Sequence, residues 1–294
     1  MNIPKIGRGE GTDGGVSEGG RTLLEGPPRA DRLSGRRSNT RRQLLSVPEL
    51  EQIPEVAWLV EDLIAEQSLA VLFGPTGSYK TFVAIDLALS IASGGTFAGR
   101  PTKRGAVAYV CAEGQAGIKW RIRAWLKANG LRDPRFWVVP AAVAFDDPDH
   151  VGELIYDLRS LPEIPSVIIV DTLARTFGKG DESNSRDMNA YIAGAEQIIS
   201  ELGATVLLIH HSTKKAHEEP RGSGALMAAA DTVLHMASKS RLQAVMSVIK
   251  QRDTDAEQEF DITLESVVVE AGSPNPKRSL CARAGCGSRR AVRR

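Results

Sequence analysis

The sequence lacks long apolar runs and has few cysteines. No apolar run approaches the roughly 18 residues that a membrane-spanning helix needs, and the polar N-terminus lacks the apolar core of a signal peptide. Of the three cysteines, Cys111 lies in an apolar stretch, and four residues separate Cys281 from Cys286, a wider spacing than the close pair of a typical zinc site. These absences argue against a membrane protein or a disulfide-stabilised secreted domain, and we expect a soluble, cytoplasmic protein.

Apolar periodicity is also missing from both ends of the chain. Residues 1–50 hold few aliphatic side chains and predict a disordered arm. Residues 271–294 contain seven Lys/Arg and no Asp/Glu, and predict a basic disordered tail, which fits either a nucleic-acid contact or a solvated run of charge. The core, residues 51–270, has 21 basic and 30 acidic residues. A polyanion would therefore have to meet local basic loops or the ends, because the body repels it.

Short apolar runs alternate with amphipathic segments from residue 68 onward, which predicts an α/β fold with a mainly parallel sheet flanked by helices. The expected strands are 68–73, 106–112, 136–141, 166–171 and 204–211, and the expected helices are 80–92, 115–129, 149–160 and 187–202. After residue 231 the pattern changes to strands joined by short turns. We therefore expect a single parallel core with a C-terminal antiparallel extension.

The stretch "GPTGSYKT" has the form of a phosphate-binding loop between a strand and a helix. Its residues are Gly74, Pro75, Thr76, Gly77, Ser78, Tyr79, Lys80 and Thr81. Lys80 would reach the outer phosphates, and the Thr81 hydroxyl would contact Mg²⁺. The pattern has glycine where this chain has Tyr79, which fits easily if its φ is negative and costs of order 1 kcal/mol or more if φ is positive. Taken alone, a chance glycine-rich turn explains the stretch equally well.

Two acidic residues follow other expected strands. "VIIVD" ends in Asp171, the form of a Walker B strand whose carboxylate holds Mg²⁺. "AYVCAEG" ends in Glu113, which at the carboxyl edge of a parallel sheet could polarise an attacking water; a glutamate that caps the next helix is an equal alternative.

The strand "LLIHH" ends in His210 and His211, which face opposite sides if the strand continues. One of the two could sense the γ-phosphate. The alternative is a structural histidine, and the remaining histidines form no metal-ligand spacing.

Together these motifs resemble the RecA-like ATPases, and within them the RepA-like and DnaB-like hexameric helicase group with the AAA_25-type ATPases of phages and plasmids. The order "GPTGSYKT", "YVCAEG", "VIIVDTLAR", "LLIHHSTK", "PRGSGALMAAAD" and "VIKQRD" carries the resemblance, which covers roughly residues 55–270. It implies that ATP and Mg²⁺ bind, that Glu113 is the catalytic glutamate, and that Lys250 and Arg252 act on the nucleotide of a neighbouring subunit. Tyr79 departs from the family pattern.

The resemblance also implies a homo-oligomer, a hexameric ring, that translocates on single-stranded DNA during phage, plasmid or mobile-element replication, with other replication proteins as partners. Candidate DNA contacts on the loops after the Walker B and sensor strands are Lys179, Lys214, Lys215 and Arg221. Acidic neighbours dilute their charge, and solvated loops without a DNA contact are an equal alternative. An ATP-dependent assembly or regulatory switch that recruits a partner without unwinding DNA is the alternative. A small-molecule kinase is disfavoured, since "KQRD" would have no role there.

Overall fold

The computed structural model describes residues 45–52, 55–213, 220–271, 275–285 and 287–289, and the chain divides into two units, Met1–Ile53 and Pro54–Arg294. In the first unit, the described residues contain one helical turn, α1 (Val47–Leu50), at whose start the main-chain N–H and the hydroxyl of Ser46 both donate hydrogen bonds to Glu49 Oε2. This turn lies inside the segment that the sequence predicts to be a disordered arm. Residues 1–44 of that arm lie outside the described residues.

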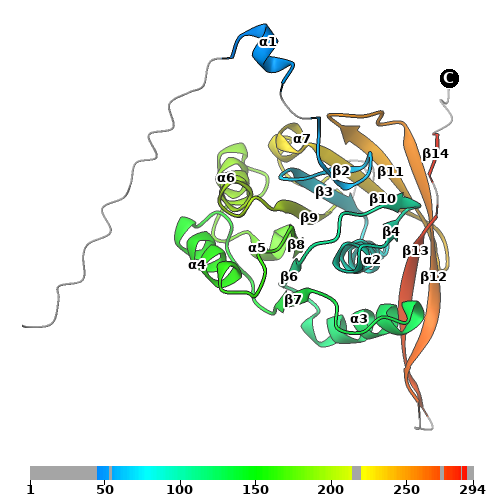
Figure 1. The fold of residues 1–294 in the computed structure, drawn as a ribbon. Helices are drawn as coiled ribbons and strands as arrows, with labels where there is room; N and C mark the ends of the chain where they lie inside the picture. The colour runs from blue at the N-terminus through cyan, green and yellow to red at the C-terminus, as the bar shows by residue number, and fades with distance from the viewer. Residues whose placement is uncertain (1–44, 53–54, 214–219, 272–274, 286, 290–294) are drawn as a thin grey trace, which may run out of the picture. The chain divides into compact units, whose positions relative to one another are not determined.

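The second unit alternates strands and helices (Figure 1). Its helices are α2 (Lys80–Ser93), α3 (Gln115–Asn129), α4 (Pro148–Arg159), α5 (Leu173–Thr176), α6 (Ser185–Leu202) and α7 (Ala225–Ala229). Its strands are β1 (Trp58–Val60), β2 (Ile64–Ala65), β3 (Leu69–Gly74), β4 (Thr96–Phe97), β5 (Arg100–Pro101), β6 (Val107–Cys111), β7 (Phe136–Val139), β8 (Val167–Asp171), β9 (Thr205–His211), β10 (Thr232–Ser240), β11 (Gln243–Gln251), β12 (Gln258–Glu270), β13 (Lys277–Ala284) and β14 (Ser288–Arg289). No helix of the described ranges is both long and apolar enough to cross a membrane.

One large sheet organises this unit. Its strand order is β13-β12-β11-β10-β3-β9-β8-β6-β7, with β14 beside β12. The strands from β10 to β7 pair in parallel, whereas β10, β11, β12 and β13 form an antiparallel meander. This arrangement confirms the predicted α/β fold, a mainly parallel sheet with a C-terminal antiparallel extension.

Helices cover both faces of the sheet, so its central strands are apolar on both sides. Every residue of β3, β6 and β8 is buried. One apolar cluster packs α2 and α3 on one face, and a second packs α4 and α6 on the other (Figure 1). Because helices cover both faces, the central strands can reach a ligand only at their ends.

The C-terminal region differs from the sequence prediction in two ways. Residues 258–270 form one long strand, β12, without the short turn that the sequence suggested within this stretch, and its buried side chains alternate from Phe260 to Leu264. Residues 277–284, expected in a disordered tail, form β13, which pairs with β12. The prediction of disorder is wrong for these residues, because β12 supplies their main-chain hydrogen bonds and Cys281 and Ala282 are buried in the cluster that contains α2 and α3.

Candidate nucleotide-binding site

The carboxyl ends of β3, β6, β8 and β9 meet at one edge of the sheet, where ligands bind in open α/β folds. A cavity of about 290 Å³ lies at this edge. It is lined by Thr76, Gly77, Tyr79, Lys80, Thr81, Phe82, Glu113, Arg121, Asp171, Thr172, Ile209 and His211. The fold thus brings residues from all four predicted motifs into one cleft.

The loop between β3 and α2 has the shape that a phosphate-binding turn requires. A Cβ on Gly74 would lie 2.3 Å from the main-chain oxygen of Met236, so no larger residue fits there. Gly77 has a φ of 82°, which favours glycine. The main-chain N–H groups at the start of α2 then supply the partial positive charge that attracts a phosphate.

Tyr79 adopts the costlier of the two conformations considered from the sequence, with a φ of 67°. Its side chain compensates through two contacts. Its ring packs near Phe82, with 6.4 Å between centroids, and its hydroxyl accepts a hydrogen bond from the main-chain N–H of Leu242 at 3.3 Å. Leu242 lies in the β10–β11 turn, so Tyr79 ties the phosphate loop to the antiparallel extension.

Lys80 is held at the centre of the loop. Its Nζ donates hydrogen bonds to the main-chain oxygens of Gly74 and Pro75, both at 2.8 Å. Burial lowers the pKa of Lys80 to about 8, against the opposing effect of the Asp171 and Glu113 carboxylates. An incoming phosphate would offer a stronger acceptor than either carbonyl and would favour the charged ammonium.

Asp171 and Thr81 form the group that could hold a divalent cation. Asp171 Oδ2 accepts hydrogen bonds from the Thr81 hydroxyl at 2.9 Å and from the Tyr109 hydroxyl at 2.7 Å. The other oxygen, Oδ1, is buried and has no hydrogen-bond partner among the described residues. Burial raises the pKa of Asp171, and both hydrogen bonds oppose the shift. A free carboxylate oxygen beside a hydroxyl is the oxygen donor set that Mg²⁺ prefers, so the residues fit this ion.

Glu113 follows β6 and lines the same cleft. Its carboxylate is partly exposed and lies 3.4 Å from Nε of Arg175, which is on α5 directly after β8. Because it lines the cleft, this carboxylate could take a proton from a water molecule there, as a general base does. The cation beside it orients the carboxylate.

His210 and His211 lie on opposite sides of the sheet, as neighbouring residues of a strand do. His211 lines the cleft, and its Nδ1 has no hydrogen-bond partner among the described residues. His210 is 0% exposed, and its Nε2 lies 2.6 Å from the main-chain oxygen of Arg221. Burial lowers the pKa of His210 to about 4, so this ring is neutral and donates to that oxygen. Of the two histidines, His211 is therefore the one that lines the cleft.

Lys250 and Arg252 lie away from this cleft. Lys250 donates to the main-chain oxygens of Met227 and Ala228, and Arg252 pairs with Asp231 at 2.6 Å. Asp231 in turn accepts a hydrogen bond from the N–H of Leu69, the first residue of β3. Both cations therefore lie toward the amino end of β3, opposite the edge that carries the phosphate loop.

The candidate DNA contacts are only partly described. Lys214 and Lys215 lie outside the described residues. Lys179 is exposed, whereas Arg221 forms an ion pair with Glu182 at 2.9 Å. This pair joins the loop after β8 to the loop after β9, and His210 contacts the same segment. Arg221 is therefore part of a contact between loops as well as a surface cation.

The site also contains residues that sequence reasoning missed. Tyr109 is fully buried in β6 and positions Asp171. Arg121, on α3, lines the cleft with its guanidinium 5.0 Å from the ring centroid of Phe82. The sequence did hold one signal for Tyr109, because a residue with a hydroxyl stands there in an otherwise apolar strand. No local pattern marks Arg121, because it reaches the cleft only through the packing of α3.

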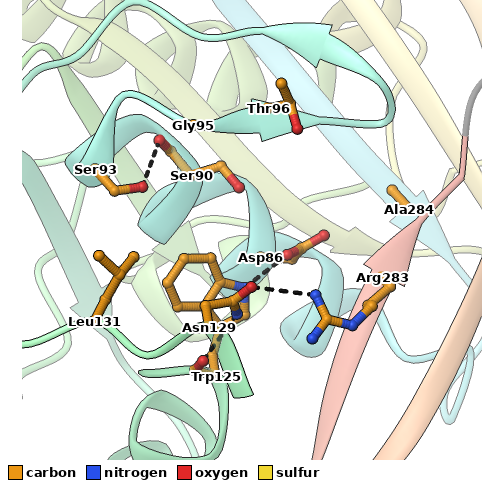
Figure 2. Close-up of a pocket in the computed structure, with 10 residues that line it drawn as sticks. All are labelled: Asp86, Ser90, Ser93, Gly95, Thr96, Trp125, Asn129, Leu131, Arg283 and Ala284. Atoms are coloured by element: carbon orange, nitrogen blue, oxygen red, sulfur yellow. Dashed lines mark hydrogen bonds between the residues drawn. The ribbon is translucent and has the colours of Figure 1, made fainter. Parts of the chain in front are cut away.

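A second cavity, of about 450 Å³, lies between α2, α3 and β13 (Figure 2). Asp86, which is 8% exposed, accepts a hydrogen bond from Trp125 Nε1 at 2.6 Å. Burial raises the pKa of Asp86 to about 6, opposed by Trp125, the Ala284 N–H and Arg283. Asn129 accepts a hydrogen bond from Arg283 at 3.1 Å at the same cavity (Figure 2). These contacts bind β13 to the helix that begins at Lys80.

Comparison with known proteins agrees with this geometry. The sequence matches the AAA_25 family, described as an AAA domain, over residues 36–217, more than half of the chain. Among solved structures, a chain described as an ATPase domain is similar, with a TM-score of 0.52 and 12% sequence identity over 67% of this chain and 82% of that chain. At this identity the likeness shows the fold alone. A search of curated proteins finds no match. The chain belongs to the AAA_25 family, and it contains an AAA-type ATPase domain with a RecA-like fold.

Proposed function

We propose that the chain hydrolyses ATP with Mg²⁺ as an assembled ring and uses this reaction to move along single-stranded DNA during phage, plasmid or mobile-element replication. The observation that supports assembly best is the position of the two late cations. The sheet register aligns Lys250 with Val233 and Val233 with Val71, three residues before Gly74. Three residues of a strand span about 10 Å, at roughly 3.3 Å each. Lys250 therefore lies about 10 Å before the loop along the strand direction, and its strand, β11, is the second strand away from β3.

Arg252 lies farther from the loop, at the Asp231 carboxylate. Neither cation reaches the cleft of its own chain, but Arg252 is exposed and Lys250 partly exposed to a partner that docks on this edge of the sheet. A head-to-tail contact would bring them to the cleft of the next copy, and such contacts close into rings. A cation supplied across an interface stabilises the charge that develops on the transferred phosphate, by about 10³-fold or more in related chemistry.

Within one subunit, the side chains divide the remaining tasks. Lys80 and the loop N–H groups would bind the phosphates, and Thr81 and Asp171 would hold Mg²⁺, which would neutralise phosphate charge when bound. Glu113 would take the proton of the attacking water. His211, which lines the cleft together with the loop, would report the state of the γ-phosphate to the segment that follows β9.

A nucleotide-dependent switch that binds ATP, recruits a partner and turns over slowly is the second candidate. The tethered loop supports it, because Tyr79 holds the phosphate loop against Leu242 in a strained conformation. Such a loop favours one state of the site over rapid cycling.

Steady-state ATP hydrolysis over a series of protein concentrations, with and without single-stranded DNA, separates the two candidates. The ring translocase predicts turnover that rises more than linearly with protein and rises again with DNA. ATP binding that depends on Lys80, with turnover indifferent to DNA, would favour the switch and contradict translocation.

A further inference from the structure

A cluster of positive charge surrounds one indole ring on α3, outside the nucleotide cleft. Residues 115–132 contain no Asp or Glu, and β13 contains none either. Lys119 and Arg123, one helical turn apart on α3, lie with Lys277 of β13 around the ring of Trp120. We call these four residues the Trp120 surface.

The distances place all three cations against the ring. Lys119 Nζ is 4.7 Å, Lys277 Nζ 4.8 Å and Arg123 Cζ 5.2 Å from the ring centroid. Trp120 is partly exposed, and the three cations are exposed. Attraction between each cation and the ring holds the group together, although the cations repel one another.

One acidic residue, Glu270, lies beside this charge. It pairs with Arg123 at 3.3 Å and is the cross-strand neighbour of Lys277, and neither Lys119 nor Lys277 forms an ion pair with an acidic residue among the described residues. The remainder of the core is acidic, so a polyanion is attracted only where cations gather locally. The Trp120 surface is such a place, and an aromatic face lies at its centre.

We propose that the Trp120 surface binds single-stranded nucleic acid, with a base replacing a lysine ammonium over the Trp120 ring and the flanking phosphates paired with Lys119, Arg123 and Lys277. Aromatic rings bordered by cations are the usual means of holding single strands, because every base offers a π face and every nucleotide a phosphate. A duplex conceals the faces of its bases and would meet only the cations. This inference rests on the proposed action on single-stranded DNA, and it assigns the contact to α3 and β13 rather than to the loops after β8 and β9.

The surface has room to continue along β13. Arg283 lies six residues after Lys277 on the same strand, about 20 Å away. Its guanidinium lies at the second cavity, beside Asn129 near the end of α3 (Figure 2). A strand bound at Trp120 could therefore extend along α3 and β13 toward Arg283, whose Nε lies 3.6 Å from the Glu265 carboxylate. Arg121, one residue after Trp120, lines the nucleotide cleft, so α3 carries residues of both sites.

The test is the affinity of the full-length protein for a fluorescent oligothymidylate, measured by anisotropy over a series of salt concentrations. Trp120→Ala should weaken binding about tenfold, and Trp120→Phe should retain most of it. Lys277→Ala should reduce the slope of log affinity against log salt by about 0.7. Lys103→Ala is the matched control, because it removes an exposed lysine paired with Glu66 and should leave affinity and slope unchanged.

ATP hydrolysis of the same proteins, with and without the oligonucleotide, separates this inference from the proposed function. If DNA stimulates wild type, Trp120→Ala and Lys277→Ala equally, and the three bind it with equal affinity, the inference is overturned and the proposed function stands. If affinity falls in Trp120→Ala but DNA never stimulates hydrolysis, the surface is supported and translocation is not. Equal competition by duplex DNA, or no binding by wild type, would also overturn the inference.

Discussion

The hydroxyl oxygen of Tyr79 accepts a hydrogen bond from the main-chain N–H of Leu242, a residue 163 positions later in the chain. This bond connects the phosphate loop to the turn between β10 and β11. Tyr79 stands where the usual pattern has glycine, and its φ of 67° is the conformation that glycine adopts without cost. The side chain thus compensates locally for the strain that its own backbone creates.

The backbone strain and the side-chain contacts of Tyr79 together predict the order of stability of its variants. Tyr79→Ala keeps the positive φ and loses the ring contact and the hydrogen bond, so it should be the least stable variant. Tyr79→Gly loses the same contacts but relieves the backbone, and should be about 1 kcal/mol more stable than Tyr79→Ala. Tyr79→Phe should lose only the hydrogen bond, about 1 kcal/mol. Urea unfolding of the three variants measures these differences.

If Tyr79→Gly and Tyr79→Ala have the same free energy of unfolding, residue 79 does not have a positive φ in solution. The rate of nucleotide exchange provides a second measurement on the same proteins. The freed loop of Tyr79→Gly should exchange nucleotide faster than wild type, since it no longer has the Leu242 contact.

The Tyr109 hydroxyl should affect how tightly the proposed site at Asp171 binds Mg²⁺. Tyr109→Phe leaves Asp171 Oδ2 with Thr81 as its single hydrogen-bond donor among the described residues, which weakens the orientation of the carboxylate. The Mg²⁺ concentration needed for half-maximal ATP hydrolysis should rise about tenfold or more, as for other residues that orient a metal ligand. Removal of Mg²⁺ with a chelator should abolish hydrolysis in both proteins.

Tyr191→Phe is a matched control for this effect. Tyr191 is also fully buried, and its hydroxyl lies 2.7 Å from that of Thr176. The two substitutions remove the same atom from similar surroundings, so both should cost some stability. A similar change in Mg²⁺ dependence in both variants would show that Tyr109 acts through general stability alone.

The Asp86 carboxyl predicts a dependence of stability on pH. Its pKa is about 6 in the folded chain and 3.8 ordinarily, so the folded state holds the proton more tightly. The stabilisation is complete below about pH 4 and is lost as pH rises through 6, a total of roughly 3 kcal/mol at 1.36 kcal/mol per unit. Asp86→Asn, which does not titrate, should therefore gain stability relative to wild type between pH 4 and 7.

Urea unfolding of both proteins across this range measures the difference directly. His210, with a pKa lowered to about 4, titrates in the same range with the opposite sign, but it is present in both proteins and cancels. A difference between the two proteins that is constant with pH would show that Asp86 is not desolvated as the structure has it.

Local patterns were sufficient to predict much of the fold and cleft. An apolar run followed by a glycine-rich turn, or by an acid, defines a strand end within a few residues, and the carboxyl ends of parallel strands must meet. That reasoning placed Lys80, Glu113 and Asp171 at one edge. Because side chains alternate along a strand, the sequence also predicted that His210 and His211 face opposite sides. It did not predict which of the two lines the cleft.

Contacts between segments far apart in the sequence could not be predicted from local patterns. The sign of φ at Tyr79 depends on Leu242, and β13 depends on the main chain of β12, so neither leaves a pattern in its own stretch of sequence. The same holds for Trp120, whose cations come partly from a strand more than one hundred and fifty residues later. Side chains that act through tertiary packing were the ones the sequence did not reveal.

The most direct test of the account mixes two inactive proteins, Lys80→Ala and Arg252→Ala, and measures ATP hydrolysis. Each should be nearly inactive alone, the first without a phosphate-binding lysine and the second without the cation for its neighbour. In an equal mixture about one interface in four joins an intact cleft to an intact Arg252, so hydrolysis should recover to about a quarter of the wild-type rate. Full activity of Arg252→Ala alone, or no recovery in mixed assemblies, would contradict catalysis across a subunit interface.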